Sequence, residues 1–434
     1  MANTDTAKLF SNEDFAGEML SDSVVSNGFI VEKLLDGSDQ FREIMKCSKI
    51  KTICGKDICE SNGFTSKIYL VSIEFQQENG NSSEQQKFSA VMKTVCPKRV
   101  QDSIMSTITD VNKNQKDDIG KEEFMEKIAK NISLIHNQEC DFYTLFGNIS
   151  KEIMPLPDIY YIQKSDLEKD TPGVIIMEDL TESSCMVPIY EGLSVQQIKT
   201  IVRHLAAFHH FLLCETDANW KKICGKFVFE DCENDFGDRI VENVVEWNKD
   251  YFEVPLRKLK NVVKSKQMIY ALRECAQEFG LPELLVHGDL WTNNLLWKKT
   301  ADGSNPERVA AFMDWQLLFK GNLAVDIANI ISCCEPDVRK ELESFILEYY
   351  YDEFSRRMHD SGKSVGYRIE QLRKAYEYAF ISKTVSMCGM AHMCAQIKKE
   401  DGEDKNKTLA KRAKIAVEDA VVLVERIAPE WLCL

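Results

Sequence analysis

The sequence predicts an α+β protein with two segregated lobes, a small strand-rich N-terminal lobe and a larger, mainly helical C-terminal lobe. Two observations support this prediction. Runs rich in β-forming residues recur in the first part of the chain, up to Met177. Amphipathic helical patterns dominate beyond that point. Strands and helices that are separated along the chain favour segregated layers over a doubly wound sheet, in which they would alternate.

The chain has 434 residues and a formal net charge of −15. This length accommodates two lobes, and we expect them over residues 1–179 and 180–434. The acidic balance argues against a nucleic-acid partner, since the phosphate backbone requires a concentrated basic face. No basic start followed by an apolar run opens the sequence, and no stretch reaches the roughly 20 apolar residues that span a bilayer. We therefore expect a cytoplasmic protein without membrane insertion, and its oligomeric state stays open.

Two strand patterns near the N-terminus predict a β-hairpin. Lys67–Phe75 partly alternates between apolar and polar residues, and Lys87–Val95 follows it after a polar turn. A polar insert at about residues 101–121 separates this hairpin from a helical pattern over Glu122–Phe146. Val174–Met177 is expected to form a short buried strand that closes the N-terminal lobe.

Helices fill the predicted C-terminal lobe. Ser194 begins the first of them, because its hydroxyl and Gln197 three residues later make a capping box. Further helices are expected over Val338–Met358, Glu370–Ile397 and Asn406–Ala428.

The most informative motif is V-H-G-D-L-W-T-N-N-L-L, which places His287, Asp289 and Asn294 in the spacing H-x-D-x-x-x-x-N. Asp314 follows Asp289 by 25 positions, at the end of a second apolar run. Kinase catalytic loops have this arrangement: the Asp meets the acceptor hydroxyl, while the Asn and a later Asp hold Mg²⁺. The motif therefore predicts an ATP-dependent phosphotransferase. Asp289 would be the catalytic base, and Asn294 and Asp314 the metal ligands.

The same motif has a purely structural interpretation, in which H-G-D is an ordinary polar turn. Apolar runs on both sides of the motif, Leu284–Val286 and Leu295–Trp297, favour the functional interpretation, because a hairpin beneath the site needs them. His287 is expected to hold the loop by packing and hydrogen bonding. Asp326 has two candidate structural roles, as a helix N-cap or as a buried carboxylate that accepts hydrogen bonds from the loop backbone; we favour the second.

The nucleotide-binding half of the site depends on Lys93, in A-V-M-K-T-V. On a strand its neighbours Met92 and Thr94 point to the opposite face. Lys93 is the best candidate to contact the α- and β-phosphates, with Glu139 on the following helix as its acidic partner. Other acids compete for this partnership: Asp141, Glu122, Glu123 and Glu126.

The turn before Lys67 is the plausible phosphate-covering loop, with Gly63, Phe64 and Ser66 as candidate ATP contacts. Glu178 and Leu180 would form the lobe connector that meets adenine. No G-x-x-x-x-G-K-[ST] sequence is present, which argues against a P-loop ATPase.

These motifs resemble the CHK-kinase-like (ecdysteroid-kinase-like) group of the aminoglycoside phosphotransferase and choline kinase superfamily. The matching runs, in order, are G-F-T-S-K-I-Y, V-M-K, E-C-D-F-Y, I-M-E-D-L, L-A-A-F-H, the catalytic loop, F-M-D-W-Q and D-I-A. The G-F-x-S form of the glycine loop is similar to the form found in the nematode branch of this group. The resemblance implies a two-lobed, protein-kinase-like fold with a nucleotide-binding N-terminal lobe and a catalytic C-terminal lobe. It also implies phosphorylation of a hydroxyl on a small organic molecule.

The acceptor class stays open among a steroid, a choline-like alcohol, a glycoside and a xenobiotic alcohol. Trp247, Trp291 and Trp315 are candidate walls of its pocket. Gly288 stands where protein kinases have the Arg of H-R-D, and no A-P-E follows Asp314, which favours a small acceptor over a protein. The alternative function is a catalytically silent pseudokinase that binds nucleotide or serves as a scaffold.

Overall fold

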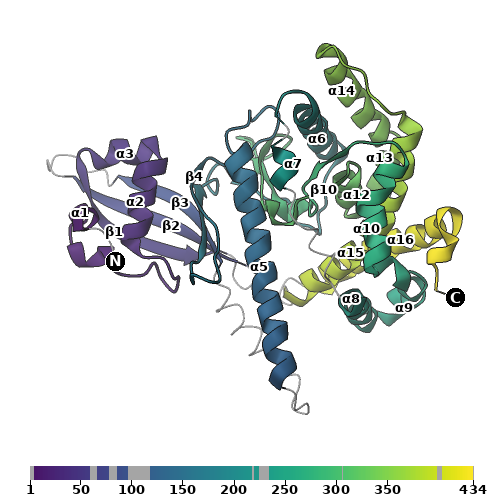
Figure 1. Cartoon of the computed structure of the whole chain (residues 1–434), viewed down its shortest axis with the longest axis horizontal. Coiled ribbons are helices and arrows are strands. Elements are labelled where there is room, and N and C mark those ends of the chain that lie inside the picture. Colours follow the sequence, from purple (N-terminus) through teal and green to yellow (C-terminus); the bar gives the residue numbers. More distant parts are fainter. Residues whose placement is uncertain are drawn as a thin grey trace. The chain divides into compact units, whose positions relative to one another are not determined.

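The computed structural model describes residues 4–58, 66–77, 86–95, 118–217, 219–223, 234–304, 306–397 and 403–433. The chain divides into two compact units (Figure 1). The first comprises Met1–Asn148 and Pro157–Glu182, and the second comprises Ile149–Leu156 and Ser183–Leu434. The predicted α+β class is confirmed, because the first unit is built on an antiparallel sheet and the second is mainly helical.

The first unit is built around a five-stranded antiparallel sheet in the order β1-β2-β3-β5-β4. Its strands are β1 (Ser48–Asp57), β2 (Lys67–Gln77), β3 (Lys87–Val95), β4 (Ile159–Gln163) and β5 (Gly173–Glu178). The predicted hairpin of β2 and β3 is confirmed, with Tyr69 opposite Met92. The predicted strand Val174–Met177 is confirmed as the centre of β5.

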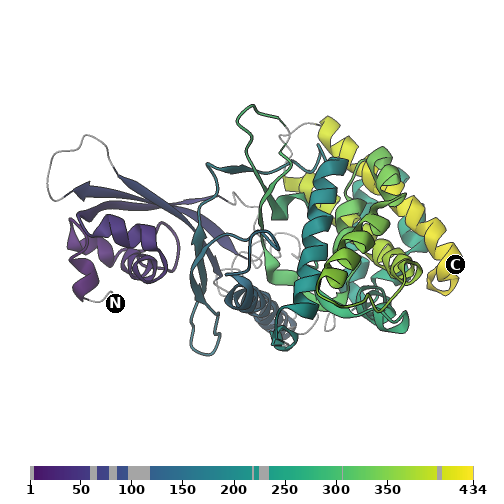
Figure 2. The ribbon, with the colours of Figure 1, turned by 90° about the horizontal axis from the view of Figure 1, so that it is seen from above.

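Helices cover this sheet on both faces. Short helices α1 (Thr4–Ala7), α2 (Asn27–Gly37) and α3 (Asp39–Met45), with the 3₁₀ turn η1 (Glu13–Ala16), lie together against one face (Figure 2). Apolar side chains of alternate strand positions, such as Val71 and Met92, point into the core beneath them. The long helix α5 (Asp118–Phe146), which contains the predicted Glu122–Phe146 helix, packs against β3, β4 and β5. The predicted insert at residues 101–121 lies outside the described residues, except for its last turn at the start of α5.

The second unit consists of helices around two small antiparallel sheets, β6-β8-β9 and β7-β10. Its strands are β6 (Ser184–Cys185), β7 (Glu283–Val286), β8 (Leu295–Lys298), β9 (Val309–Phe312) and β10 (Phe319–Asn322). Its longer helices are α6 (Val195–Cys214), α8 (Asn234–Trp247), α9 (Lys249–Lys258), α12 (Val325–Ser332), α13 (Pro336–Glu343), α14 (Ile346–Asp360), α15 (Ile369–Ile397) and α16 (Glu403–Ile427). Shorter pieces are α7 (Trp220–Ile223), α10 (Ser265–Ile269), α11 (Cys275–Glu278) and the turns η2 (Lys260–Val263), η3 (Tyr270–Glu274), η4 (Thr292–Asn294), η5 (Trp315–Leu317) and η7 (Pro429–Trp431).

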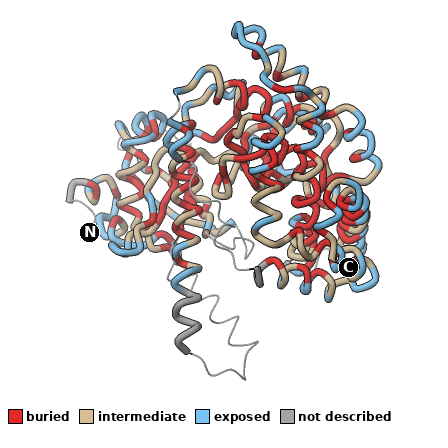
Figure 3. Tube along the Cα trace, turned by 45° about the vertical axis from the view of Figure 1, so that its right-hand side comes forward, coloured by how far each residue is buried: buried red, intermediate tan, exposed pale blue. Residues whose placement is uncertain are grey.

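Most of the helix predictions for this unit are confirmed. The Ser194 hydroxyl oxygen accepts a hydrogen bond from the Gln197 N–H, and the Gln197 side-chain oxygen accepts one from the Ser194 N–H, which is the expected capping box at the start of α6. Helices α15 and α16 match the predicted helices over 370–397 and 406–428 within a few residues. In each unit the buried residues, red in Figure 3, gather where its elements pack together.

The predicted single helix Val338–Met358 is wrong, because two helices meet there. Helix α13 ends at Glu343, and the hydroxyl of Ser344 donates to the Glu341 carbonyl at 2.6 Å, which closes its last turn. Phe345 then leaves helical geometry (φ −148°) before α14 begins. Helix α13 packs against α16, whereas α14 packs against α6, so packing against two different helices requires the break.

The segment Ile149–Leu156, which precedes β4 in the chain, belongs to the second unit. The carbonyl of Ile153 accepts a hydrogen bond from His204 Nδ1 of α6 at 3.0 Å, and the carbonyl of Pro155 accepts one from the Phe312 N–H of β9 at 2.9 Å. The segment thus lies outside the N-terminal lobe predicted over residues 1–179. Among the described helices, none combines the length and apolarity needed to cross a membrane.

Candidate active site

The H-G-D motif forms a loop between β7 and β8, in the second unit. Buried apolar residues of β7 lead into it, and Val286 pairs with Phe319 of β10. Gly288 follows in the left-handed region, at φ +81°. A Cβ atom at this position would overlap the carbonyl oxygen of Leu317 and lie 3.0 Å from the Phe319 ring. The loop therefore requires glycine at the position where protein kinases have arginine.

Replacing Gly288 by alanine is expected to destabilise the second unit by at least about 2 kcal/mol, since both the left-handed backbone and the overlap with Leu317 are unfavourable. Urea unfolding measures the effect. Gly303→Ala is the matched control, because Gly303 also has a positive φ (+71°) but nothing lies within 4 Å of its added Cβ. Equal losses for the two variants would contradict the steric argument.

Side chains hold the loop backbone on both sides of Gly288. Asp326 of α12 accepts hydrogen bonds from the N–H of His287 at 2.8 Å and from the N–H of Gly288 at 2.9 Å. Asp326 thus has the second of the two roles that the sequence left open, and Ala324 is the N-cap residue of α12. A buried carboxylate that accepts two backbone hydrogen bonds fixes the direction of the chain at the motif.

His287 holds the loop through its ring. Its Nδ1 accepts from the N–H of Asp289 at 3.3 Å, and its Nε2 lies 2.8 Å from the carbonyl oxygen of Met313. Since a carbonyl oxygen only accepts, Nε2 carries a proton and donates it to this hydrogen bond. The ring also packs on Trp315, with centroids 4.6 Å apart. His287 therefore ties the H-G-D loop to the residue before Asp314.

The structure brings Asp289, Asn294 and Asp314 together. The Asn294 amide nitrogen donates to the Asp289 backbone oxygen at 2.8 Å and to its carboxylate at 3.2 Å. The backbone N–H of Met313 donates to the Asn294 carbonyl at 2.9 Å, which places Asp314 next to both. Strands β8 and β9 produce this proximity, because Leu295 pairs with Phe312 in an antiparallel register.

Asp314 has a left-handed backbone, with φ +63° and ψ +58°. Few non-glycine residues adopt this conformation, and Asp and Asn do so more readily than most. Three described non-glycine residues have a positive φ, and Asp314 is the one that adjoins the loop. Such strained positions cluster at functional sites, where the surrounding structure holds them.

The electrostatic surroundings of Asp289 favour its use as a proton acceptor. Burial raises the pKa of its carboxyl, and the neighbouring Asp314 carboxylate adds to this, while Lys383, His287 and Asn294 act in the opposite direction. A carboxyl whose pKa lies above its ordinary range holds a transferred proton better than a solvated aspartate does.

The oxygen atoms of Asn294 and Asp314 suit a hard divalent cation such as Mg²⁺. Both hydrogen bonds from Asn294 to Asp289 use its amide nitrogen, so its amide oxygen remains as the donor atom for a cation. Mg²⁺ commonly takes only one or two protein ligands and completes its shell with phosphate and water. The residues present therefore fit the ion that the motif predicts.

Two further side chains hold the loop, and sequence analysis missed both. The Asn329 amide donates to the Leu290 carbonyl at 2.7 Å, and the Lys383 ammonium donates to the Gly288 carbonyl. Each had a detectable signal. Asn329 lies one turn after Asp326 on α12, and Lys383 interrupts the apolar i, i+4 row of Ala379 and Met387 on α15.

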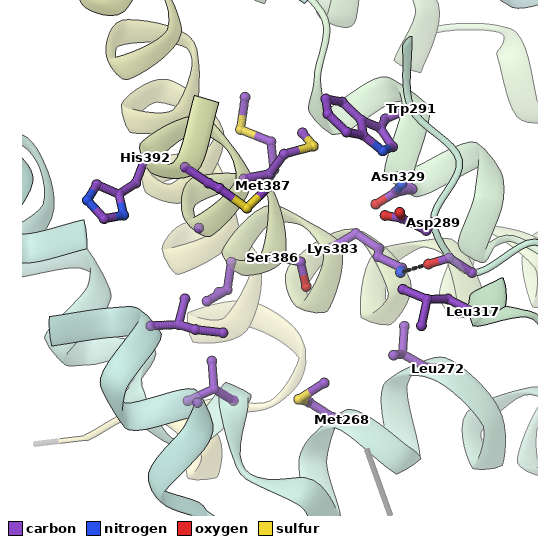
Figure 4. A pocket seen from close by; sticks show the side chains of 18 of the residues that line it. Met268, Leu272, Asp289, Trp291, Leu317, Asn329, Lys383, Ser386, Met387 and His392 are labelled. Carbon is purple, nitrogen blue, oxygen red and sulfur yellow. Dashed lines mark hydrogen bonds between the residues drawn. The ribbon is translucent and has the colours of Figure 1, made fainter. Parts of the chain in front are cut away.

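A cavity of about 420 Å³ opens beside Asp289, within the second unit. Asp289, Asn329 and Lys383 lie together at one side of it, and His392 lies at the other (Figure 4). Most of the remaining wall is apolar, from Ile240, Val263, Met268, Leu272, Leu317, Val385, Met387, Met390 and Met393. Of the three candidate tryptophans, Trp291 lines the cavity, whereas Trp315 packs on His287 and Trp247 stacks on Phe252.

In the first unit, Lys93 of β3 forms an ion pair with Glu139 of α5, with Nζ and Oε2 2.6 Å apart. Both side chains are buried, 5% and 1% exposed. Lys93 points away from the core that receives Met92, as strand alternation predicts. Of the competing acids, Asp141 pairs with Lys164 and Glu126 pairs with Lys130. The predicted Lys93–Glu139 pair is therefore present, and its contact with the phosphates of ATP stays a prediction.

The other residues predicted to contact the nucleotide stay predictions. Gly63 and Phe64 lie outside the described residues. Ser66 is half-buried directly before β2. Glu178 is the last residue of β5, and its carboxylate accepts from the Asp158 N–H at 3.1 Å. Leu180 follows that strand and is half-buried.

Comparison with known proteins identifies a family. The sequence model of family DUF1679, described as "Uncharacterized oxidoreductase dhs-27", matches residues 38–428. The chain belongs to this family. The Caenorhabditis elegans protein named "Uncharacterized oxidoreductase dhs-27" is 27% identical over 389 residues, which are 87% of this chain and 43% of that protein. The chain thus spans less than half the length of this curated relative.

Solved structures of small-molecule kinases show a weaker likeness. Plasmodium vivax ethanolamine kinase has 13% identity and a TM-score of 0.42, with 89% of this chain and 87% of that chain covered. The macrolide 2'-phosphotransferase MphH of Brachybacterium faecium has 10% identity and a TM-score of 0.34, with 87% and 97% covered. At these values neither the activity nor the substrate of these enzymes transfers to this chain.

Proposed function

We propose that this chain is a phosphotransferase that moves the γ-phosphate of Mg·ATP to a hydroxyl group of a small organic molecule. The observation that carries the proposal is the convergence of Asp289, Asn294 and Asp314 beside a cavity of about 420 Å³. A base, an amide oxygen and a second carboxylate are the groups that a kinase uses to hold a metal and deprotonate an alcohol.

The proposed residue roles follow from these positions. Asp289 orients the acceptor hydroxyl and takes its proton as the oxygen attacks the γ-phosphorus and ADP departs. Asn294 and Asp314 hold Mg²⁺, which when bound neutralises charge on the phosphates. Lys93, oriented by Glu139, contacts the α- and β-phosphates. His287 and Asp326 keep the loop in place without chemistry of their own.

The cavity supports an acceptor with a mainly hydrocarbon skeleton. Its wall is formed largely by methionine, leucine, isoleucine and valine side chains, with Trp291 beside Asp289. Such walls bind apolar surface, and a few polar groups set the orientation of the ligand. Flexible methionine side chains also adapt to ligands of different outline. Among the classes that the sequence left open, a steroid or a xenobiotic alcohol fits this wall better than a glycoside.

The name of the C. elegans relative contains the word oxidoreductase, but we do not propose an oxidoreductase activity for this chain. A dinucleotide-dependent dehydrogenase of the Rossmann type needs a parallel sheet with a glycine-rich turn at its switch point. Every strand pairing within the sheets of the described residues is antiparallel. Membership of the CHK-kinase-like group within the kinase-like superfamily remains a proposal, which the order of the motifs supports.

The direct test is ADP release from Mg·ATP in the presence of a panel of apolar alcohols, sugars and amino alcohols, with the phosphorylated product identified by mass spectrometry. Phosphate transfer to a hydroxyl supports the proposal. If the chain binds Mg·ATP but phosphorylates no member of the panel, the pseudokinase alternative is favoured.

Replacing Asp314 by alanine is expected to weaken ATP binding in the presence of Mg²⁺, by about tenfold or more, because one of the two proposed protein ligands of the ion is lost. Calorimetric titration with ATP in Mg²⁺ and in EDTA measures the effect. Asp302→Ala, in an exposed turn between β8 and β9, is the control. Unchanged binding by Asp314→Ala in Mg²⁺ would remove Asp314 from the metal site.

A further inference from the structure

The Lys383 side chain lies at the point where the cavity meets the catalytic loop. It extends from α15, is 6% exposed and donates to the carbonyl oxygen of Gly288 (Figure 4). The N–H of the same glycine donates to Asp326 at 2.9 Å. Both polar groups of Gly288 are thus held by charged side chains, an acid on α12 and a base on α15. Lys383 therefore helps to fix the backbone from which the Asp289 side chain extends.

Lys383 also determines the charge of the cavity near Asp289. Burial lowers the pKa of the Lys383 ammonium, while the carboxylates of Asp289 and Asp326 oppose this change. Two nearby carboxylates and a carbonyl acceptor together favour the charged ammonium over a neutral amine. Lys383 therefore places a positive charge beside the carboxylate that would receive the acceptor hydroxyl.

The rest of the cavity offers no compensating acid. Its described ionisable lining residues are Asp289, Lys383 and His392. Asp289 is the one carboxylate among them, and the Lys383 ammonium lies beside it. Asp326 also acts on Lys383, but its carboxylate is bound to the loop backbone and does not line the cavity. A site for a cationic ligand needs uncompensated carboxylates or a cage of aromatic rings. Among the described lining residues Trp291 is joined by one other ring, His392, at the far side of the cavity (Figure 4).

We propose that Lys383 is a specificity-determining residue that excludes acceptor alcohols bearing a cationic group near the hydroxyl and admits uncharged ones. The inference rests on the proposed function, since it takes the cavity to be the acceptor site. Because Asp289 and Lys383 lie together at one side of the cavity (Figure 4), an alcohol whose hydroxyl reaches Asp289 places an ammonium on the adjacent carbon near Lys383. The two like charges then repel each other in a partly desolvated site.

The test compares two matched ligands, n-octanol and its amino derivative with an ammonium group on the carbon next to the carbinol. Their dissociation constants are measured by calorimetry with the full chain, with no need for turnover. The wild-type protein is expected to bind n-octanol at least about 30-fold more tightly than the amino alcohol, because close like charges are strongly unfavourable. Comparable affinities, or no binding of n-octanol, would overturn the proposal.

Variants of Lys383 assign the discrimination to this side chain. Lys383→Met, which removes the charge at similar length, is expected to reduce the ratio to about threefold or less, and Lys383→Arg is expected to preserve most of it. Lys374→Met is the matched control, since Lys374 is exposed on the same helix. A ratio that is the same in Lys383→Met and wild type overturns the proposal.

If Lys383→Met does not fold, Lys383→Gln makes the same comparison, because its amide carries no charge and can still donate to the Gly288 carbonyl. Thermal unfolding checks each variant. Failure of the proposed function has a different signature. In that case the ligand discrimination depends on Lys383 as expected, yet no alcohol is phosphorylated in the turnover assay.

Discussion

Replacing Asp289 by asparagine is expected to lower the rate of phosphate transfer by about 10²–10⁴-fold, because general-base assistance is typically worth that much. The amide cannot accept the proton of the acceptor hydroxyl. ATP affinity should change little, since the proposed metal ligands are Asn294 and Asp314. Single-turnover transfer and equilibrium ATP binding, measured on the same preparation, separate the two effects.

Asp360→Asn provides the control for this substitution, because Asp360 is exposed at the end of α14. It should transfer phosphate at the wild-type rate. Normal transfer by Asp289→Asn would show that the carboxylate is not the base, even if the loop geometry is unchanged. If Asp289→Asn loses ATP binding as well as phosphate transfer, Asp289 would instead be a ligand of the metal ion.

The second large effect concerns the buried ion pair of the first unit. Glu139→Gln removes the carboxylate 2.6 Å from Lys93 and leaves a buried ammonium without that counter-charge. We expect a loss of about 3–5 kcal/mol in the free energy of unfolding, as for other buried pairs that lose one member. Phosphate transfer should also fall, because Lys93 loses the group that orients it.

A double variant distinguishes stability from function at this pair. Lys93→Met with Glu139→Leu replaces both charges by apolar groups, and such replacements of buried pairs are often neutral or stabilising. It should recover most of the stability but none of the activity. Glu126→Gln, in an exposed pair with Lys130 on the same helix, should leave urea unfolding unchanged. Recovered activity in the double variant would show that Lys93 has no role with ATP.

Local features of the chain were predictable because neighbouring residues determine them. The β2–β3 hairpin follows from two β-rich runs around a polar turn, and the α6 capping box follows from Ser194 and Gln197. The convergence of Asp289, Asn294 and Asp314 was also within reach. A single antiparallel strand pair, β8 and β9, is enough to bring these residues together.

The features that could not be predicted from the sequence depend on packing between segments far apart in the chain. Lys383 lies 95 positions after the glycine whose carbonyl it contacts, and a lysine on a helix is usually solvated. The break at Phe345 has no glycine or proline to mark it, and follows from packing of α13 and α14 against different helices. In the same way, nothing local shows that Ile153 and Pro155 contact α6 and β9.

The contacts of Ile153 and Pro155 have a practical consequence for anyone who divides this protein into fragments. The polypeptide passes from one unit to the other after Asn148, returns after Leu156 and passes again after Glu182. A recombinant fragment that starts at residue 183 would lack the strip Ile149–Leu156, whose carbonyls accept hydrogen bonds from His204 and Phe312. One cleavage point therefore cannot yield two intact halves, and an expression plan for the catalytic half has to include that strip as well.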